Sequence, residues 1–267
     1  MGLELFKRDQ HVCVMFTDLV GGDDGGAVQA NQVLIVDHGH GMLLDPGGAM
    51  TYNDLFVSLS RYLPPKELQY VFASHQDPDI VASLQRWLTS SQTTLLVSRL
   101  WDRFVPHFCQ SGKTLGRIVG IPDRGGVVTL GKAKLQILPA HFLHAEGNLQ
   151  VYDPVSRILF SGDLGASIGP AARAAQFVED LPAHLPAMAG FHRRYMVSNK
   201  VCKLWAQMVR ALDIEMIVPQ HGAPIRGKRA VDAFIDWIAH LECGIDVMSA
   251  SDYRAPDASW EIDAASA

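Results

Sequence analysis

The sequence predicts an α/β fold in which two layered halves of mixed β-sheet are covered by helices. Three observations predict this fold. Short apolar runs of strand length alternate with segments that have helical spacing. Several neighbouring apolar runs are separated only by a turn, so some strands pair antiparallel and the sheets are mixed. No low-complexity linker divides the interior, which indicates one domain.

The first half of the chain is rich in predicted strands. Apolar runs predict strands at residues 12–16, 33–36, 42–44, 68–73 and 94–97. A Gly-containing turn between the second and third runs predicts a hairpin. Helical spacing predicts helices at residues 52–63, 80–88 and 100–108. The glycine-rich segment 21–26 lacks the lysine of a P-loop, so we expect a plain surface loop there.

The second half repeats the alternation. Apolar runs predict strands at residues 127–130, 135–138, 149–152, 157–160 and 216–219, and the first four of these form two hairpins. A helix is expected after Ser198, with apolar residues on one stripe, and another at residues 230–247. We therefore expect a single domain over residues 1–248, followed by a disordered tail at 249–267.

Composition excludes several classes of function. The 267 residues are 48% hydrophobic and 19% charged, with a formal net charge of −5, which argues against binding to nucleic acid or an anionic membrane. No segment approaches the roughly 18 apolar residues of a spanning helix. Four separated cysteines without a CxxC pair indicate buried thiols in a reducing compartment. A cytoplasmic protein is expected.

Polar side chains that can bind metals follow four of the predicted strands. The stretch ASHQDPDI carries three of them in five residues, and the full set is His75, Asp77, Asp79, His144, Asp163 and His221. Residues at strand ends gather at one rim of a sheet. Several carboxylates cannot share a dry cleft without cations between them. The pattern therefore predicts a site for two metals, with one carboxylate bridging them.

Simpler interpretations apply to each residue taken alone. Asp77 or Asp79 could cap the helix that follows, with Pro78 in its first turn. Asp163 and His221 could be ordinary turn residues beside glycine. A lone histidine is usually exposed or satisfied in the core, and this interpretation is adopted for His11, His38, His40, His107, His184, His192 and His240.

The motifs resemble those of the metallo-β-lactamase superfamily, whose fold is a four-layer αββα sandwich of two mixed β-sheets. LLDPGG at 43–48, SGD at 161–163 and PQHG at 219–222 carry the resemblance. Within the superfamily the chain is most similar to the di-iron branch, comprising the catalytic domain of flavodiiron proteins and the stand-alone oxygen-binding di-iron proteins. The segments HAEGN (144–148) and FHRRYM (191–196), and the 18 residues between His144 and Asp163, resemble that branch.

The resemblance implies a ligand for each metal position. Metal 1 would be held by His75, Asp77 and His144, metal 2 by Asp79 and His221, and Asp163 would bridge both. His141 competes with His144 for its position; spacing favours His144 and leaves His141 as a group that could orient a ligand.

Two departures from the pattern matter for the metals. Asp77 stands where hydrolytic members have a histidine and flavodiiron enzymes usually have the longer glutamate. Ile80 replaces a histidine that hydrolytic members use at the second metal, so metal 2 is expected to have few protein ligands. Carboxylates mixed with imidazole favour iron or manganese over zinc, and the resemblance implies two iron ions, with zinc or manganese as alternatives.

The resemblance implies a non-haem di-iron protein that binds O2 or NO. It would act as an oxygen sensor with a signalling partner, or as an O2/NO reductase. Because this chain has no FMN domain, electrons would then come from a separate flavoprotein. A homodimer is compatible with both. The alternatives are a metal-dependent hydrolase of a phosphoester or thioester, and a binding module with a structural metal.

Overall fold

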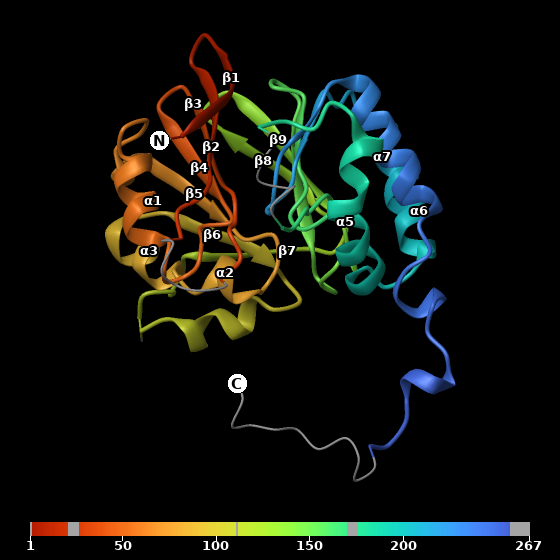
Figure 1. Ribbon diagram of the computed structural model, residues 1–267. Coiled ribbons are helices and arrows are strands. Elements are labelled where there is room, and N and C mark those ends of the chain that lie inside the picture. The colour runs from red at the N-terminus through yellow and green to blue at the C-terminus, as the bar shows by residue number, and fades with distance from the viewer. Residues whose placement is uncertain (1, 21–26, 111, 170–175, 257–267) are drawn as a thin grey trace.

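The structure is a computed structural model that describes residues 2–20, 27–110, 112–169 and 176–256. In this part of the chain, two β-sheets pack face to face (Figure 1). The first sheet has seven strands in sequence order: β1 (Leu3–Arg8), β2 (His11–Phe16), β3 (Gln32–Asp37), β4 (His40–Leu44), β5 (Leu68–Phe72), β6 (Thr94–Ser98) and β7 (Ile118–Ile121). The second has six: β13 (Ile225–Arg226), β12 (Met216–Val218), β11 (Ile158–Phe160), β10 (Leu149–Asp153), β9 (Ala133–Pro139) and β8 (Gly126–Leu130).

Helices cover the outer face of each sheet, which completes the four layers (Figure 1). The first sheet is covered by α1 (Tyr52–Leu59), α2 (Pro78–Val81) and α3 (Leu84–Ser90). The second is covered by α5 (Leu181–Tyr195), α6 (Asn199–Val209) and α7 (Lys228–His240). Short 3₁₀ turns complete the described elements: η1 (Pro65–Glu67), η2 (Asp102–Phe108), η3 (Gly244–Asp246) and η4 (Ala250–Asp252). The predicted αββα sandwich is confirmed.

Buried side chains on both faces of the central strands explain their continuous apolar runs. Along β2, Val14 and Phe16 pack with the helices of the first sheet. The alternate residues Cys13 and Met15 pack toward the second sheet. The alternation follows from the two-residue period of a strand, so one strand contributes to two separate cores.

Both sheets are mixed, as the hairpin spacing predicts. Strands β1 to β4 pair antiparallel and β4 to β7 parallel. In the second sheet β8 to β11 pair antiparallel, and β11 pairs parallel with β12. The predicted β3–β4 hairpin turns at His38 and Gly39, whose φ angles of 47° and 80° are typical of a tight two-residue turn.

Three predicted helices differ from the structure in their extent, and the one expected at 52–63 ends at Leu59. The expected helix at 80–88 is divided into α2 and α3 at Ser83, whose hydroxyl donates to the carbonyls of Pro46 and Gly47 instead of continuing the helix. The expected helix at 230–247 ends at His240. Gly244 then turns the chain with a φ of +52°.

Other differences are smaller. The predicted helix at 100–108 is the 3₁₀ turn η2, which contains Pro106. Strands β1, β7 and β13, helix α5 and the turns η1 and η4 lie outside the predicted elements. The glycine-rich segment 21–26 and residues 257–267 of the predicted tail lie outside the described residues, while η4 forms within that tail. The division into one domain and a disordered tail stays a prediction.

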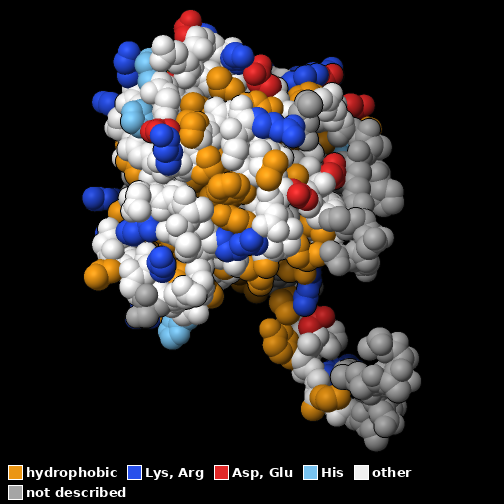
Figure 2. Space-filling model, turned by 90° about the vertical axis from the view of Figure 1, so that its left-hand side faces the viewer, with side chains coloured by type: hydrophobic (Ala, Val, Ile, Leu, Met, Phe, Trp, Pro, Cys, Tyr) orange, Lys and Arg blue, Asp and Glu red, His pale blue; other side chains and the backbone are white. Residues whose placement is uncertain are grey.

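The surface agrees with the charge balance of the sequence. Figure 2 shows the side on which α1 and α3 lie, where basic, acidic and apolar side chains are interspersed, without the basic stripe of a nucleic-acid-binding face. None of the helices in the described ranges is long and apolar enough to cross a membrane.

Candidate metal centre

The six predicted ligand residues lie on loops that leave the strands at one edge of the sandwich. His75, Asp77 and Asp79 follow β5, and the last of them lies in the first turn of α2. The other three come from the second sheet: His144 precedes β10, Asp163 follows β11 and His221 follows β12. Residues as far apart in the sequence as positions 75 and 221 are thereby brought together from both sheets.

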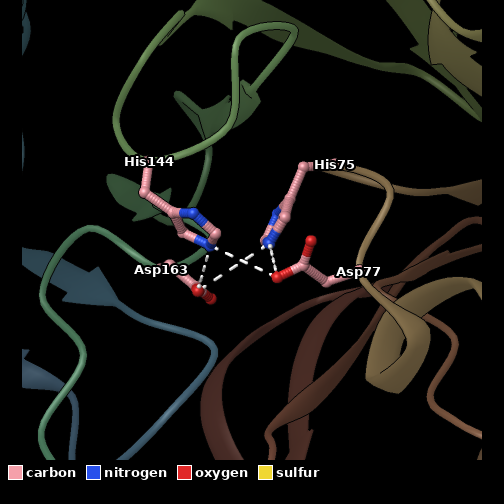
Figure 3. A group of neighbouring side chains, drawn as sticks. All are labelled: His75, Asp77, His144 and Asp163. Carbon is pink, nitrogen blue, oxygen red and sulfur yellow. Dashed lines mark ion pairs between the residues drawn. The ribbon is translucent and has the colours of Figure 1, made fainter. Parts of the chain in front are cut away.

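Four of the six side chains form a first cluster (Figure 3). Nε2 of His144 lies 2.9 Å from Asp163 Oδ2 and 3.4 Å from Asp77 Oδ2. Nε2 of His75 lies 3.7 Å and 3.6 Å from the same two oxygens. Two imidazole nitrogens and two carboxylate oxygens therefore face one point, as the ligands of one metal ion would.

The remaining two side chains form a second cluster with the other oxygen of Asp163. Nε2 of His221 lies 3.5 Å from Asp163 Oδ1 and 3.4 Å from Asp79 Oδ2. Asp163 thus presents Oδ2 to the first cluster and Oδ1 to the second. This is the arrangement expected of a carboxylate that bridges two metal ions.

Hydrogen bonds to the far side of the rings orient two of the histidines. His221 Nδ1 donates to the carbonyl of Gln29 at 2.8 Å, which directs Nε2 toward the cluster. His75 Nδ1 lies 2.9 Å from Ser74 Oγ. The amide of Ser74 in turn donates to Asp45 Oδ1 at 2.7 Å. Burial raises the pKa of Asp45 to about 6 against this hydrogen bond.

Buried polar atoms without partners show that cations fit the site. Within the described residues, His75 Nε2 and Asp163 Oδ1 are buried and have no hydrogen-bond partner. Such groups are costly because desolvation is not compensated. A cation in each cluster would pair with both atoms, and oxygen and imidazole donors suit iron, manganese or zinc.

The charges of the cluster shift the pKa values of its members. Burial lowers the pKa of His144, but hydrogen bonds to Asp163 and Asp77 outweigh it and raise the pKa to about 10. Hydrogen bonds from His144 and His75 hold the pKa of Asp77 far below its usual range. Burial raises the pKa of Asp163, yet the His144 hydrogen bond and the neighbouring imidazoles lower it overall. The carboxylates of Asp77 and Asp163 therefore stay ionised and attract positive charge, whereas burial raises the pKa of Asp79.

A cavity of about 570 Å³ opens beside both clusters. Asp77, Asp79, His144, Asp163 and His221 line it on one side. The remaining described wall is mainly apolar, with Val28, Met50, Ile168, Phe191 and Tyr195 prominent. Among the described lining residues there is neither lysine nor arginine. The cavity therefore suits a small uncharged ligand better than an anion.

The simpler interpretation of the ASHQDPDI stretch is also resolved by the geometry. Asp77 stands at the N-cap position of α2, with Pro78 as the first helical residue, but its side chain makes no capping hydrogen bond. It faces His75 and His144 instead. His141 points away from the clusters, because its Nε2 donates to the carbonyl of Asp123 at 2.8 Å.

Comparison with known proteins places the chain in a family. A model described as ODP family beta lactamase matches residues 28–222, which include all six residues of the two clusters. The chain belongs to the ODP family. The expected membership of the metallo-β-lactamase superfamily is confirmed.

Solved structures agree with this assignment. The chain is 38% identical, with a TM-score of 0.81, to the chemotaxis sensor ODP in a structure of its peroxy di-iron species. It is 37% identical, with a TM-score of 0.82, to the apo state of the chemotaxis sensor ODP from T. denticola. Each comparison covers 92% of this chain and 97% of the other.

More distant relatives share the fold. Rubredoxin oxygen:oxidoreductase from the anaerobe Desulfovibrio gigas is 17% identical with a TM-score of 0.74, over 89% of this chain and 61% of that one. An uncharacterized protein of Methanocaldococcus jannaschii is 26% identical over 194 residues, 72% of this chain and 48% of that protein. The chain spans half or less of the length of the curated relatives it matches.

Two side chains of this ODP family member support the clusters without having been predicted. Gln220 is buried, and its Nε2 donates to Asp79 Oδ2 at 3.2 Å. His192 accepts a hydrogen bond from the amide of Gly165, two residues after Asp163, and its Nδ1 donates to Met188. The interpretation of His192 as a satisfied core residue is correct. The sequence signal for Gln220 was its place next to His221 in PQHG.

Ile80 occupies a different place from the one a metal ligand would need. Its side chain is fully buried with Leu55 and Leu59 in the core beneath the helices of the first sheet. Among the described residues, the second cluster therefore has Asp79 and His221 of its own and shares Asp163. The first cluster has two histidines, His75 and His144, whereas the second has His221.

Proposed function

We propose that the chain is a non-haem di-iron protein that binds O2 or NO at a carboxylate-bridged centre. The observation that carries the proposal is the placement of Asp163, whose two oxygens face two separate groups of ligands. His75, Asp77 and His144 would hold one iron, and Asp79 and His221 would hold the other. Bound ferrous ions would supply reducing electrons and open coordination positions for a diatomic ligand.

The protein's own residues favour a diatomic ligand near the second metal. That metal would have two unshared protein ligands, compared with three at the first, so more of its positions are open. The mainly apolar wall of the cavity suits small uncharged molecules. Phe191 and Tyr195 stack on each other with ring centroids 4.7 Å apart and both contact His144 by their edges, which shields the first cluster.

Similarity to the chemotaxis sensor ODP supports sensing over rapid turnover. The sensor structure is that of a peroxy di-iron species and covers nearly the whole of this chain. We propose that this chain likewise signals oxygen to a protein partner. Reductase activity with a separate flavoprotein donor, and a homodimeric state, remain alternatives that the same centre would allow.

A hydrolase of phosphoesters or thioesters is less favoured. An anionic substrate would find no lysine or arginine among the described residues of the cavity wall. The second cluster also lacks the histidine that Ile80 replaces. Zinc or manganese in the same clusters would be needed for such chemistry.

Metal analysis with an oxygen titration tests the proposal. Anaerobically purified protein is expected to contain two iron ions per chain and to develop a visible absorption band when O2 is added. The variant Asp163→Ala should lose both, while the exposed-surface control Asp54→Ala should behave as the wild type. Protein containing only zinc, with no band on oxygenation, would contradict the proposal.

The same preparation separates sensing from reduction. A sensor is expected to consume about one O2 per centre and then stop, even with excess reduced flavoprotein. A reductase would continue to consume O2 until the donor is exhausted. Continued consumption would therefore replace the sensing role with the reductase role and leave the di-iron centre intact.

A further inference from the structure

A second group of buried ionisable side chains lies at the opposite end of the sandwich. His11 and Cys13 are in β2, Asp37 ends β3 and Asp153 ends β10. All four are less than 5% exposed. The candidate di-iron centre lies at the start of β10, where His144 precedes the strand. Asp153 ends the same strand, roughly 13 Å further along it. None of these four residues belongs to the two clusters of the candidate di-iron centre.

Three of these side chains present one donor atom each to a common point. His11 Nε2 lies 2.8 Å from Asp153 Oδ2. Cys13 Sγ lies 3.6 Å from the same oxygen and 3.8 Å from His11 Nε2. In tetrahedral zinc coordination the ligand atoms are about 3.4–3.6 Å apart, given metal–ligand distances of about 2.0–2.3 Å. Both distances from Cys13 Sγ are already near these values. The distance between His11 Nε2 and Asp153 Oδ2 would need to lengthen by about 0.6 Å.

The fourth side chain orients the histidine as a metal site requires. His11 Nδ1 lies 3.0 Å from Asp37 Oδ1, so the ring can donate there and direct Nε2 toward Cys13 and Asp153. Asp37 is fixed in turn, because its Oδ2 accepts from the amides of Lys132 and Ala133 at 2.6 Å and 3.2 Å. A carboxylate behind a histidine ligand is the usual support of bound zinc.

We propose that His11, Cys13 and Asp153 bind one zinc ion, separate from the di-iron centre. Thiolate with imidazole selects zinc over the harder metals that suit an all-oxygen and imidazole site. The ligands of this zinc ion come from both sheets, so the ion would link the two sheets at the edge remote from the di-iron centre. His11 directly follows the exposed turn at Asp9 and Gln10.

The charge balance of this group permits one zinc ion to replace two protons. Without a metal, His11 faces a carboxylate at each nitrogen; burial lowers its pKa, but Asp153 and Asp37 raise it overall, and burial raises the pKa of the Cys13 thiol. Zinc binding releases one proton from His11 Nε2 and one from Cys13 Sγ. Two positive charges leave as one doubly charged ion enters, so the net charge of the group is unchanged.

Cobalt(II) titration of the metal-free protein tests the zinc site, because a cobalt–thiolate charge-transfer band reports only ions bound to sulfur. The six di-iron ligands include no cysteine, so their occupation gives no such band. We expect one equivalent of cobalt with a thiolate band in the wild type and equally in Asp163→Ala. The band should disappear in Cys13→Ser and persist in the matched controls Cys109→Ser and Cys202→Ser. A band that survives in Cys13→Ser overturns the proposal.

A measurement on the unmodified protein covers the case in which Cys13→Ser fails to fold. X-ray absorption at the zinc edge of protein loaded with one zinc equivalent, with the di-iron centre filled with iron, should show one sulfur at about 2.3 Å. Zinc surrounded only by nitrogen and oxygen, or zinc that fails to bind, would show that protons alone neutralise this group. Either result leaves the di-iron proposal unaffected, since the two sites share no residue.

Discussion

Side chains that never touch a metal determine how the candidate di-iron ligands are held. Gln220 donates to Asp79 Oδ2, and its own Oε1 is buried with no partner in the described structure. Asp79 is one of only a few ligands expected at the second metal. A change in its orientation therefore affects that metal more than the first.

Replacing Gln220 with leucine should weaken the second metal selectively. Leucine fills a similar volume but donates no hydrogen bond, so Asp79 loses its fixed orientation. Loss of such a supporting bond typically lowers metal affinity by about 10–100-fold. Anaerobic iron titration of Gln220→Leu should show one tight and one weakened site, whereas the control Gln69→Leu should show two tight sites. Equal weakening of both sites would mean that Gln220 acts through general stability.

His192 makes folding sensitive to acid. Burial lowers its pKa to about 4, although the hydrogen bond to Met188 opposes this. The unfolded state, with a pKa of about 6.5, binds the proton first, so stability falls as the pH decreases from about 6.5 to 4. The loss reaches about 3 kcal/mol at most. Urea unfolding of His192→Gln at pH 7 and pH 4.5 should show a smaller difference than the wild type; an equal difference would assign the sensitivity elsewhere.

The sequence predicts charged site residues far better than neutral ones. His75, Asp77 and Asp79 are recognisable because charged groups directly after a buried strand need partners. An amide such as Gln220 carries no charge, and its place next to His221 in PQHG is its one sequence signal. A neutral core histidine such as His192 has no feature that distinguishes it from any other buried histidine before its partner, the amide of Gly165, is known.

At the scale of elements, hydrogen bonds join the loop after β4 to α3 and to α2, which contains Asp79. Ser83 is fully buried between α2 and α3, and its hydroxyl donates to the carbonyls of Pro46 and Gly47. Trp87 Nε1 also donates to Pro46. These bonds fix α2, whose first turn contains Asp79, against the LLDPGG loop.

Replacing Ser83 with alanine should therefore destabilise the fold. Two buried carbonyls each lose one donor, although Pro46 keeps the Trp87 indole and Gly47 keeps the Ser83 amide, so the cost is about 0.5–1.5 kcal/mol in the free energy of unfolding. Thr89→Ala is the matched control, because its hydroxyl also donates to a carbonyl but is exposed. The control should change stability by less than about 0.5 kcal/mol. Chemical denaturation of both variants measures the difference, and a similar small effect in both would refute the role assigned to Ser83.

Elements buried on both faces are predictable from sequence, and those at the margins are not. β2 and β3 read as continuous apolar runs because each contributes to two cores. β1 was missed because it is an edge strand with exposed residues such as Lys7 and Arg8. Helix α5 was missed because Pro182 and Pro186 lie within it; the missing backbone donor at Pro186 would normally argue against a helix.

At the scale of the whole molecule, metal binding links the two halves of the sandwich. The loop after β5 belongs to the first sheet, whereas the loops carrying His144, Asp163 and His221 belong to the second. Direct contact at this edge includes the amide of Leu149, which donates to the carbonyl of Ser74. Without cations, the same loops confront each other with three carboxylates.

Removing the metals should consequently lower the stability of the entire fold. Ions that bind only the native state stabilise it by about 4 kcal/mol per site when their concentration is about 1,000 times the dissociation constant. Anaerobic thermal unfolding should therefore give a lower Tm for chelator-treated protein than for protein loaded with two iron ions. Asp163→Ala should unfold at one temperature with or without iron, because it loses the shared ligand of both clusters. If metal-free and iron-loaded wild type unfold together, the clusters do not couple the two sheets, and the loops must instead be held by their hydrogen bonds alone.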